Sequence, residues 1–287
     1  MLPVDWPFTP VVLWLAFGGL LALLVVRTIR RDRREYQRFK RYQTTLRRQA
    51  MMRKWLLDSA LSIGALSIVL LALSWQFITP LRYQLQSWIP ILPWVGWTIV
   101  IGVALVFAGL TLGGLVAARR TPEEPIMIGD IGAMLPRNRQ ELRLGWLLSI
   151  NAGLSEELMF RLAIPAVLYG ASGSAILSLV VAVLLFGALH SYQGVSGVVG
   201  TTVVGLAMMF AYVATGTILV PIVLHILVDL RSLVVLPSVL FDAHKIDGRV
   251  QRFISRTPTR AASVAAAAED AAAEDATAED ATAPPAP

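Results

Sequence analysis

The feature that most constrains the fold of this 287-residue chain is a set of apolar stretches long enough to cross a lipid bilayer. A hydrocarbon core about 30 Å thick requires roughly 20 apolar residues of helix. Phe8–Val26, Trp55–Ile78 and Ile91–Ala118 reach that length, and the last contains no charged residue. With 56% apolar and 15% charged residues, the chain is also too oily for an ordinary soluble domain. We therefore predict a multi-pass protein of the cell membrane.

The second half of the chain contains weaker candidates for membrane spans. They are interrupted by charged or small residues but keep the helical length; they are Leu142 to about Gly170, Ser174–His190, Val195–Thr215 and Ile218–Leu240. Together with the first three they predict an all-α, polytopic transmembrane helix bundle of about seven to eight spans. We expect residues 1–141 to form an N-terminal group of spans and residues 142–240 a second unit.

The segment 27–54 is dense in lysine and arginine. Because cytoplasmic flanks carry an excess of these residues, this loop is expected inside, the N-terminus outside and the C-terminus inside. Tyr36, Phe39, Tyr42 and Leu46 recur at helical spacing, which is typical of an amphipathic helix lying on the anionic inner leaflet. A solvated charged helix that only fixes the topology is the alternative.

Two segments follow the last expected span. Residues 241–260 are basic and are expected in the cytoplasm, whereas residues 261–287 repeat Ala, Glu, Asp and Thr and predict a disordered acidic tail. The net charge of +6 is explained by the juxtamembrane loop, so no nucleic-acid partner is expected. The chain has no cysteine, which excludes a disulfide framework and a thiol nucleophile.

Ionisable side chains are costly inside a membrane span, so they usually face a cavity or a partner. Within the expected spans they concentrate in the second half of the chain: Glu156, Glu157, Arg161, His190, His225, Asp229 and Arg231. Glu157 and Arg161 are four residues apart, on one helix face where they can pair. Glu156 points about 100° away from Glu157 and is free to project into a cavity.

The histidines have similar spacings. His225 and Asp229 are four apart, and His190 follows Phe186 by four, with Gly187 between them to allow close approach of another helix. Three helices would then converge on one polar chamber. A glutamate and histidines in a mostly dry chamber can activate water and stabilise an oxyanion, which indicates hydrolysis of an amide.

These residues also resemble the motifs of a known family. "EELMFR" (156–161), "FGALH" (186–190) and "HILVD" (225–229) are similar to the EExxxR, FxxxH and HxxxN/D motifs of the CAAX protease and bacteriocin-processing family of intramembrane endopeptidases. The three occur in the family's order, and the resemblance covers roughly residues 142–240. It implies an endopeptidase that hydrolyses peptide bonds of membrane-associated proteins or peptides, with no cofactor.

The resemblance also implies a role for each matched residue. Glu156 and His190 would activate the attacking water, His225 and Asp229 would line the oxyanion site, and Glu157, Arg161 and Phe186 would support them.

Several alternatives stay open at this point. Where the family has Asn, the amide donates directly, so Asp229 is either protonated or orients His225. A zinc ion held by Glu156, His190 and His225 is an alternative to the metal-free mechanism. The pair of Glu157 and Arg161 could serve only to lock helices together. The whole chain could be a catalytically silent membrane scaffold or an immunity-type protein of the same fold.

Overall fold

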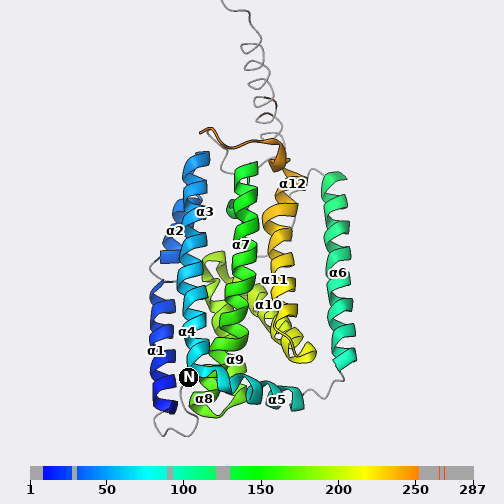
Figure 1. The fold of residues 1–287 in the computed structure, drawn as a ribbon. Coiled ribbons are helices and arrows are strands. Elements are labelled where there is room, and N and C mark those ends of the chain that lie inside the picture. Colours follow the sequence, from blue (N-terminus) through cyan, green and yellow to red (C-terminus); the bar gives the residue numbers. More distant parts are fainter. Residues whose placement is uncertain are drawn as a thin grey trace, which may run out of the picture.

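The computed structural model describes residues 9–27, 31–88, 93–120, 130–251, 265 and 268. Within these ranges the chain is helical and has no strand, which confirms the expected all-α bundle (Figure 1). Five of the described helical stretches are long and apolar enough to cross a membrane. They are Thr9–Arg27, Thr45–Trp88, Trp94–Val116, Ser191–Thr215 and Leu219–Leu240.

The first half of the bundle begins with α1 (Thr9–Arg27) and the short helix α2 (Arg33–Phe39). A continuous helical stretch then runs through α3 (Thr45–Ser59), a π-helical turn (Ala60–Gly64), α4 (Ala65–Ser74), a 3₁₀ turn (Trp75–Phe77) and α5 (Ile78–Trp88). In Figure 1, α3 and α4 run down the length of the bundle and α5 turns across its lower end. The predicted span Trp55–Ile78 is thus the middle of a longer helical run.

Helix α5 holds the end of a helix from the second half. Arg82 Nη1 donates to the carbonyl of Gly216 at 2.8 Å, and Gln86 Nε2 donates to the carbonyl of Val213 at 3.0 Å. These carbonyls lie at the C-terminus of α10 (Gly194–Thr215), where a cation and amide donors satisfy groups that the helix leaves unpaired.

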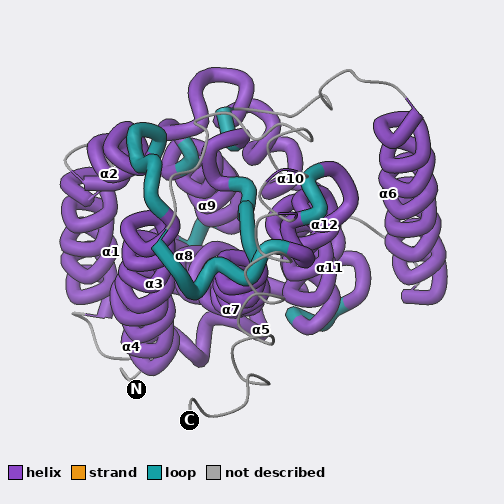
Figure 2. The backbone as a smooth tube through the Cα atoms, turned by 90° about the horizontal axis from the view of Figure 1, so that it is seen from above, coloured by secondary structure: helices purple, strands orange, loops and turns teal. Residues whose placement is uncertain are grey.

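Helix α6 (Pro93–Arg120) lies at the edge of the bundle, where it contacts α10 and α12 (Figures 1 and 2). One contact to the bundle is made by Arg231, whose Nε donates to Thr111 Oγ1 at 2.9 Å. A second is an apolar cluster of Leu115 with Leu236 and Leu240. Most of the remaining described side chains of α6 are exposed, as expected for a helix surrounded by lipid.

Along the chain, the second half of the bundle consists of a long helical run, an antiparallel helix pair and a second long run. The bounds are α7 (Arg139–Glu157), a π-helical turn η5 (Leu158–Ala163), α8 (Ile164–Ser172), α9 (Ala175–Leu189), a 3₁₀ turn η6 (Ser191–Gln193), α10, α11 (Leu219–Leu230), a π-helical turn (Arg231–Val235) and α12 (Leu236–Leu240). Helix α7 packs along α11, and α9 packs along α10. A side chain at Gly153 of α7 would collide with Ile226 of α11, so the glycine permits this close approach.

A buried polar cluster joins the two halves at the end from which the C-terminal segment leaves. The side chains of Arg48 on α3 and Glu141 on α7 are 1% and 0% exposed, and Arg48 Nη2 lies 3.1 Å from Glu141 Oε2. Arg48 also donates to the carbonyls of Ala133 and Leu135 at 2.9 and 3.1 Å. A buried charge is tolerable when it is paired and hydrogen-bonded in this way. Sequence reasoning had treated Arg48 only as part of the basic loop.

Helix α1 begins at one end of the bundle, and the described C-terminal segment, up to Gln251, lies at the other (Figure 1). A hydrogen bond connects that segment to α3: Thr45 Oγ1 donates to the carbonyl of Val250 at 2.9 Å. The predicted disordered tail lies almost wholly outside the described residues. The predicted orientation in the membrane stays a prediction.

Candidate active site

Three helix segments bring the ionisable residues of the second half together. Glu156 and Glu157 end α7, and Arg161 lies in the π-helical turn η5 that follows. His190 caps the C-terminus of α9, and His225 and Asp229 lie on α11. π-helical turns within α-helices occur frequently at functional sites.

Glu157 is the most enclosed member of this group. Its side chain is 0% exposed, and Oε2 lies 2.9 Å from Arg161 Nε. The two atoms are close but not aligned as a hydrogen bond, so the contact is an ion pair. On its other side, Glu157 Oε1 accepts a hydrogen bond from His225 Nδ1 at 2.7 Å. One carboxylate therefore joins the first motif to the third.

Arg161 extends the cluster to α10 and α9. It is 2% exposed, and its Nη2 donates to the carbonyl of Gly205 at 3.3 Å. Its guanidinium carbon lies 4.5 Å from the ring centroid of Phe186, a cation–π contact. The ion pair thus links α10 and α11, as the structural interpretation of Glu157 and Arg161 expects. Their part in catalysis stays a prediction.

Phe186 is the centre around which the three motifs meet. Its ring centroid lies 5.0 Å from the His190 ring and 6.1 Å from the His225 ring. The ring is buried, with 3% of the residue exposed. A side chain at Gly205 would come within 2.7 Å of this ring, so the glycine leaves room for it.

The hydrogen bond of His190 defines its neutral tautomer. His190 Nδ1 lies 2.8 Å from the carbonyl oxygen of Phe186. A carbonyl can only accept, so Nδ1 carries the proton. In the neutral ring Nε2 then carries the lone pair and is available to accept a proton.

Glu156 differs from its neighbour in that its Oε2 atom has neither a hydrogen bond nor an ion pair among the described residues. Its side chain is half-buried, and its Oε2 atom is buried with no hydrogen-bond partner among the described residues. A buried carboxylate oxygen without a donor is costly and is uncommon in structures. Such an atom is well suited to hold a water molecule or a substrate group.

Asp229 lies near the second ring nitrogen of His225, Nε2. Its Oδ2 is 3.8 Å from His225 Nε2, which is ion-pair range but too far for a hydrogen bond. Asp229 is also within electrostatic range of Glu156 and His190. Because Glu157 makes the short contact to His225, it is Glu157 that orients the imidazole ring, and the role of Asp229 stays a prediction.

Two neighbours of the site were not identified from sequence. The carbonyl of Gly205 receives Arg161, and Tyr192 lies with its ring centroid 6.0 Å from that of His190. Tyr192 is also in electrostatic range of Glu156 and Asp229. An isolated glycine within an apolar helix is a weak signal of a close approach, and nothing in the sequence marks Tyr192.

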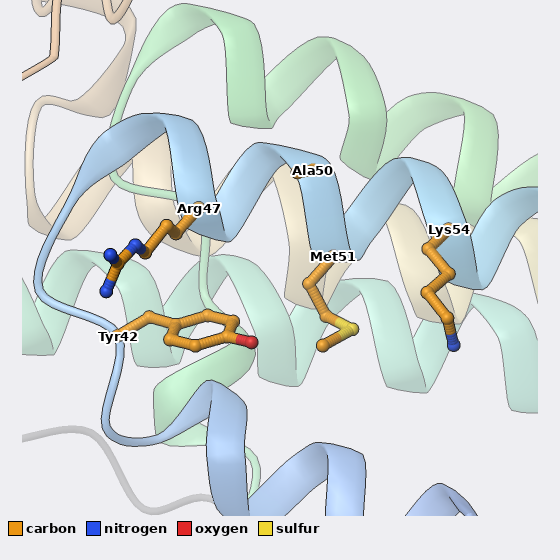
Figure 3. Close-up of a pocket in the computed structure, with 5 residues that line it drawn as sticks. All are labelled: Tyr42, Arg47, Ala50, Met51 and Lys54. Carbon is orange, nitrogen blue, oxygen red and sulfur yellow. The ribbon is translucent and has the colours of Figure 1, made fainter.

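No group of three His, Asp or Glu side chains is arranged to hold a metal ion in the described part of the chain. A surface hollow of about 390 Å³ lies instead on the basic segment, lined by Tyr42, Arg47, Ala50, Met51 and Lys54 (Figure 3). None of the candidate site residues Glu156, His190 and His225 lines this hollow, so we do not regard the hollow as the active site.

The fold and the cluster define a class: a helical membrane protein with a buried carboxylate, guanidinium and imidazole group beside an unpartnered glutamate. Comparison with protein families gives the more particular assignment. Residues 138–231 match the family described as type II CAAX prenyl endopeptidase Rce1-like. This match confirms the resemblance seen in the motifs, and it covers the region that carries the candidate site. Searches of curated proteins and of solved structures each found no match.

Proposed function

We propose that this protein is an intramembrane endopeptidase that hydrolyses peptide bonds of membrane-associated proteins or peptides with a glutamate-activated water. The observation that carries the proposal is the contrast between the two adjacent glutamates. Glu157 is held by Arg161 and His225, whereas Glu156 presents a buried oxygen without a described partner. Glu156 Oε2 has neither a hydrogen bond nor an ion pair among the described residues, so we assign the water molecule to Glu156.

In the first chemical step, a water held by Glu156 and His190 attacks the carbonyl carbon of the scissile bond. A new C–O bond forms, the carbonyl electrons move to oxygen, and the water proton passes to Glu156 or to His190 Nε2. General base catalysis of this kind contributes roughly 10²- to 10⁴-fold to a rate. When the intermediate collapses, the C–N bond breaks and the same proton is transferred to the leaving amine.

We assign His225 the role of stabilising the oxyanion of the intermediate. Glu157 accepts from Nδ1 and fixes the ring, which leaves Nε2 directed toward Asp229. When the ring carries both protons, Nε2–H donates to the oxyanion, and a preoriented donor of this kind is worth about 10²- to 10³-fold in rate. Arg161 adds a fixed positive charge behind Glu157.

The test is cleavage by purified full-length protein in nanodiscs. The substrates are a fluorogenic peptide ending in a farnesylated CAAX sequence, the same peptide without the lipid, and a set of apolar transmembrane peptides. Glu156→Gln and His190→Ala are compared with wild type and with His244→Ala. His244 is exposed and lies outside the three motifs, which makes it a matched control.

The proposal requires cleavage that is lost in Glu156→Gln and His190→Ala and retained in His244→Ala. Cleavage must also survive a strong chelator; loss on chelation that zinc restores would replace the proposal with a metal mechanism. If wild type cleaves none of the substrates, and Glu156→Gln complements a deletion strain as well as wild type does, the chain acts as a scaffold.

A further inference from the structure

We propose that Tyr36 and Tyr192 are positioning residues for His190, and that helix α2 of the N-terminal basic segment is thereby part of the active-site assembly. The inference rests on the proposed function, since it concerns the base of that reaction. Tyr36 lies outside the matched range 138–231, and the family motifs do not include Tyr192.

His190 lies at the turn between α9 and α10. The chain leaves α9 at His190 and enters α10 through η6, and Gly194 adopts a φ of +81° there. Gln193 stabilises this turn: its backbone N–H donates to the carbonyl of His190 at 2.9 Å, and its side-chain amide donates to the Tyr192 hydroxyl at 3.0 Å. The Tyr192 ring lies beside the His190 ring, with 6.0 Å between centroids.

Tyr36 of α2 contacts Tyr192. The Tyr36 ring contacts the Tyr192 ring edge-on, with 5.4 Å between centroids. Aromatic pairs in this geometry contribute about 0.5 to 1.5 kcal/mol beyond their buried area. Tyr36 is 2% exposed, so its side chain is buried and packs against Tyr192.

A backbone bridge also runs from α2 to the same turn. The Tyr36 hydroxyl donates to the carbonyl of Asp130, and the N–H of Asp130 donates to the carbonyl of Gln193 at 3.0 Å. Lys40 Nζ holds the carboxylate of Asp130 at 2.6 Å. Burial raises the pKa of the Tyr36 hydroxyl, with Asp130 adding to the effect, so the hydroxyl remains a proton donor at neutral pH. The turn is therefore fixed by ring packing and by two successive hydrogen bonds.

Helix α2 carries three exposed arginines; Arg34 and Arg38 lie on the face opposite Tyr36, and Arg33 begins the helix. Arg33, Arg34 and Arg38 form no ion pair with the carboxylates of the described residues. A helix with one cationic face suits the anionic surface of the inner leaflet. Helix α2 thus presents its arginines away from the fold while Tyr36 packs on the turn that carries the proposed base.

The experiment uses full-length protein in nanodiscs and two readouts. One is kcat and KM for the best substrate of the panel above. The other is the rate at which diethyl pyrocarbonate modifies each histidine, followed by mass spectrometry. The chain has 3 histidines, so His190 can be followed with the exposed His244 as internal reference. The variants are Tyr36→Ala, Tyr36→Phe, Tyr192→Ala and the control Tyr42→Ala, whose ring packs on Phe39.

We expect Tyr36→Ala and Tyr192→Ala to lower kcat by roughly tenfold to a hundredfold with little change in KM, as loss of positioning does. The modification rate of His190 should rise several-fold relative to His244 in both. Tyr36→Phe keeps the ring but loses the donor to Asp130, and should show a smaller change of both quantities in the same direction. Tyr42→Ala should resemble wild type.

An unchanged kcat and an unchanged His190 reactivity in Tyr36→Ala would overturn the inference. If Tyr36→Ala does not fold, the same two quantities are measured in Tyr36→Phe, and unchanged values there would overturn the inference. The histidine reactivity does not require turnover. A wild type without protease activity but with the expected reactivity pattern would refute the proposed function while leaving the structural coupling intact.

Discussion

Glu157 Oε1 lies 2.7 Å from His225 Nδ1, and this contact joins two motifs that are 68 residues apart in the chain. The two adjacent glutamates therefore differ in their contacts. Glu157 is in contact with Arg161 and His225, while Glu156 Oε2 has no hydrogen-bond partner among the described residues, which is the contrast on which the proposed function rests.

The first prediction concerns the stability that depends on Glu157. The substitution Glu157→Gln removes the counter-ion of Arg161 and leaves a buried, unpaired guanidinium. We expect the free energy of unfolding to fall by about 3 to 5 kcal/mol, the usual cost of breaking a buried pair. Denaturant unfolding in a mild detergent measures it.

The control for this prediction is Lys245→Gln, which removes the exposed ion pair of Lys245 and Asp242. Exposed pairs contribute about 0 to 1 kcal/mol, so little change is expected. Equal stabilities of the two variants would show that the Glu157 pair is not a buried electrostatic contact.

The second prediction concerns the polar cluster between α3 and α7. Arg48→Met should destabilise the protein by about 3 to 5 kcal/mol, because Glu141 would be left charged and buried. Arg47→Met, one residue earlier and on the exposed side of α3, should stay within about 0.5 kcal/mol of wild type. Thermal unfolding of both variants compares a buried and an exposed arginine on one helix. Similar midpoints would contradict the burial of Arg48.

The third prediction concerns the space under Phe186. Gly205→Ala would place a methyl group 2.7 Å from the Phe186 ring, which must move and displace its contacts to the histidines. Overpacking of this kind costs about 1 to 3 kcal/mol, and we expect cleavage to decrease with it. Gly109→Ala on α6 has no atom within 4 Å of the new methyl group and should leave both stability and cleavage unchanged. Equal behaviour of the two variants would refute the proposed packing.

Sequence reasoning succeeded where the signal was local. Apolar length predicted the helical bundle, and the spacing of Glu157 and Arg161 predicted their ion pair, which the structure forms across a π-helical turn. The family motifs identified which charged residues belong together. Each of these inferences uses residues within one helix or a pattern of known order.

The contacts that the sequence did not predict join distant parts of the chain. Arg48 and Glu141 are 93 residues apart, and Tyr36 meets Tyr192 through a turn whose geometry depends on Gly194. One arginine among many in a basic loop does not indicate that its side chain is buried. The sequence did separate Glu156 from Glu157, because adjacent residues point to different helix faces, but it did not predict that Glu157 contacts His225.

The role proposed for Glu156 is tested most directly by comparing Glu156→Gln with wild type in one preparation, with the cleavage rate and the unfolding midpoint as readouts. The buried oxygen of Glu156 has no hydrogen-bond partner among the described residues, so its replacement removes no described hydrogen bond to that atom. We expect the cleavage rate to be at least about 10²-fold lower, as for loss of a general base, at an unchanged unfolding midpoint. A Glu156→Gln variant that cleaves at the wild-type rate would contradict the proposed role.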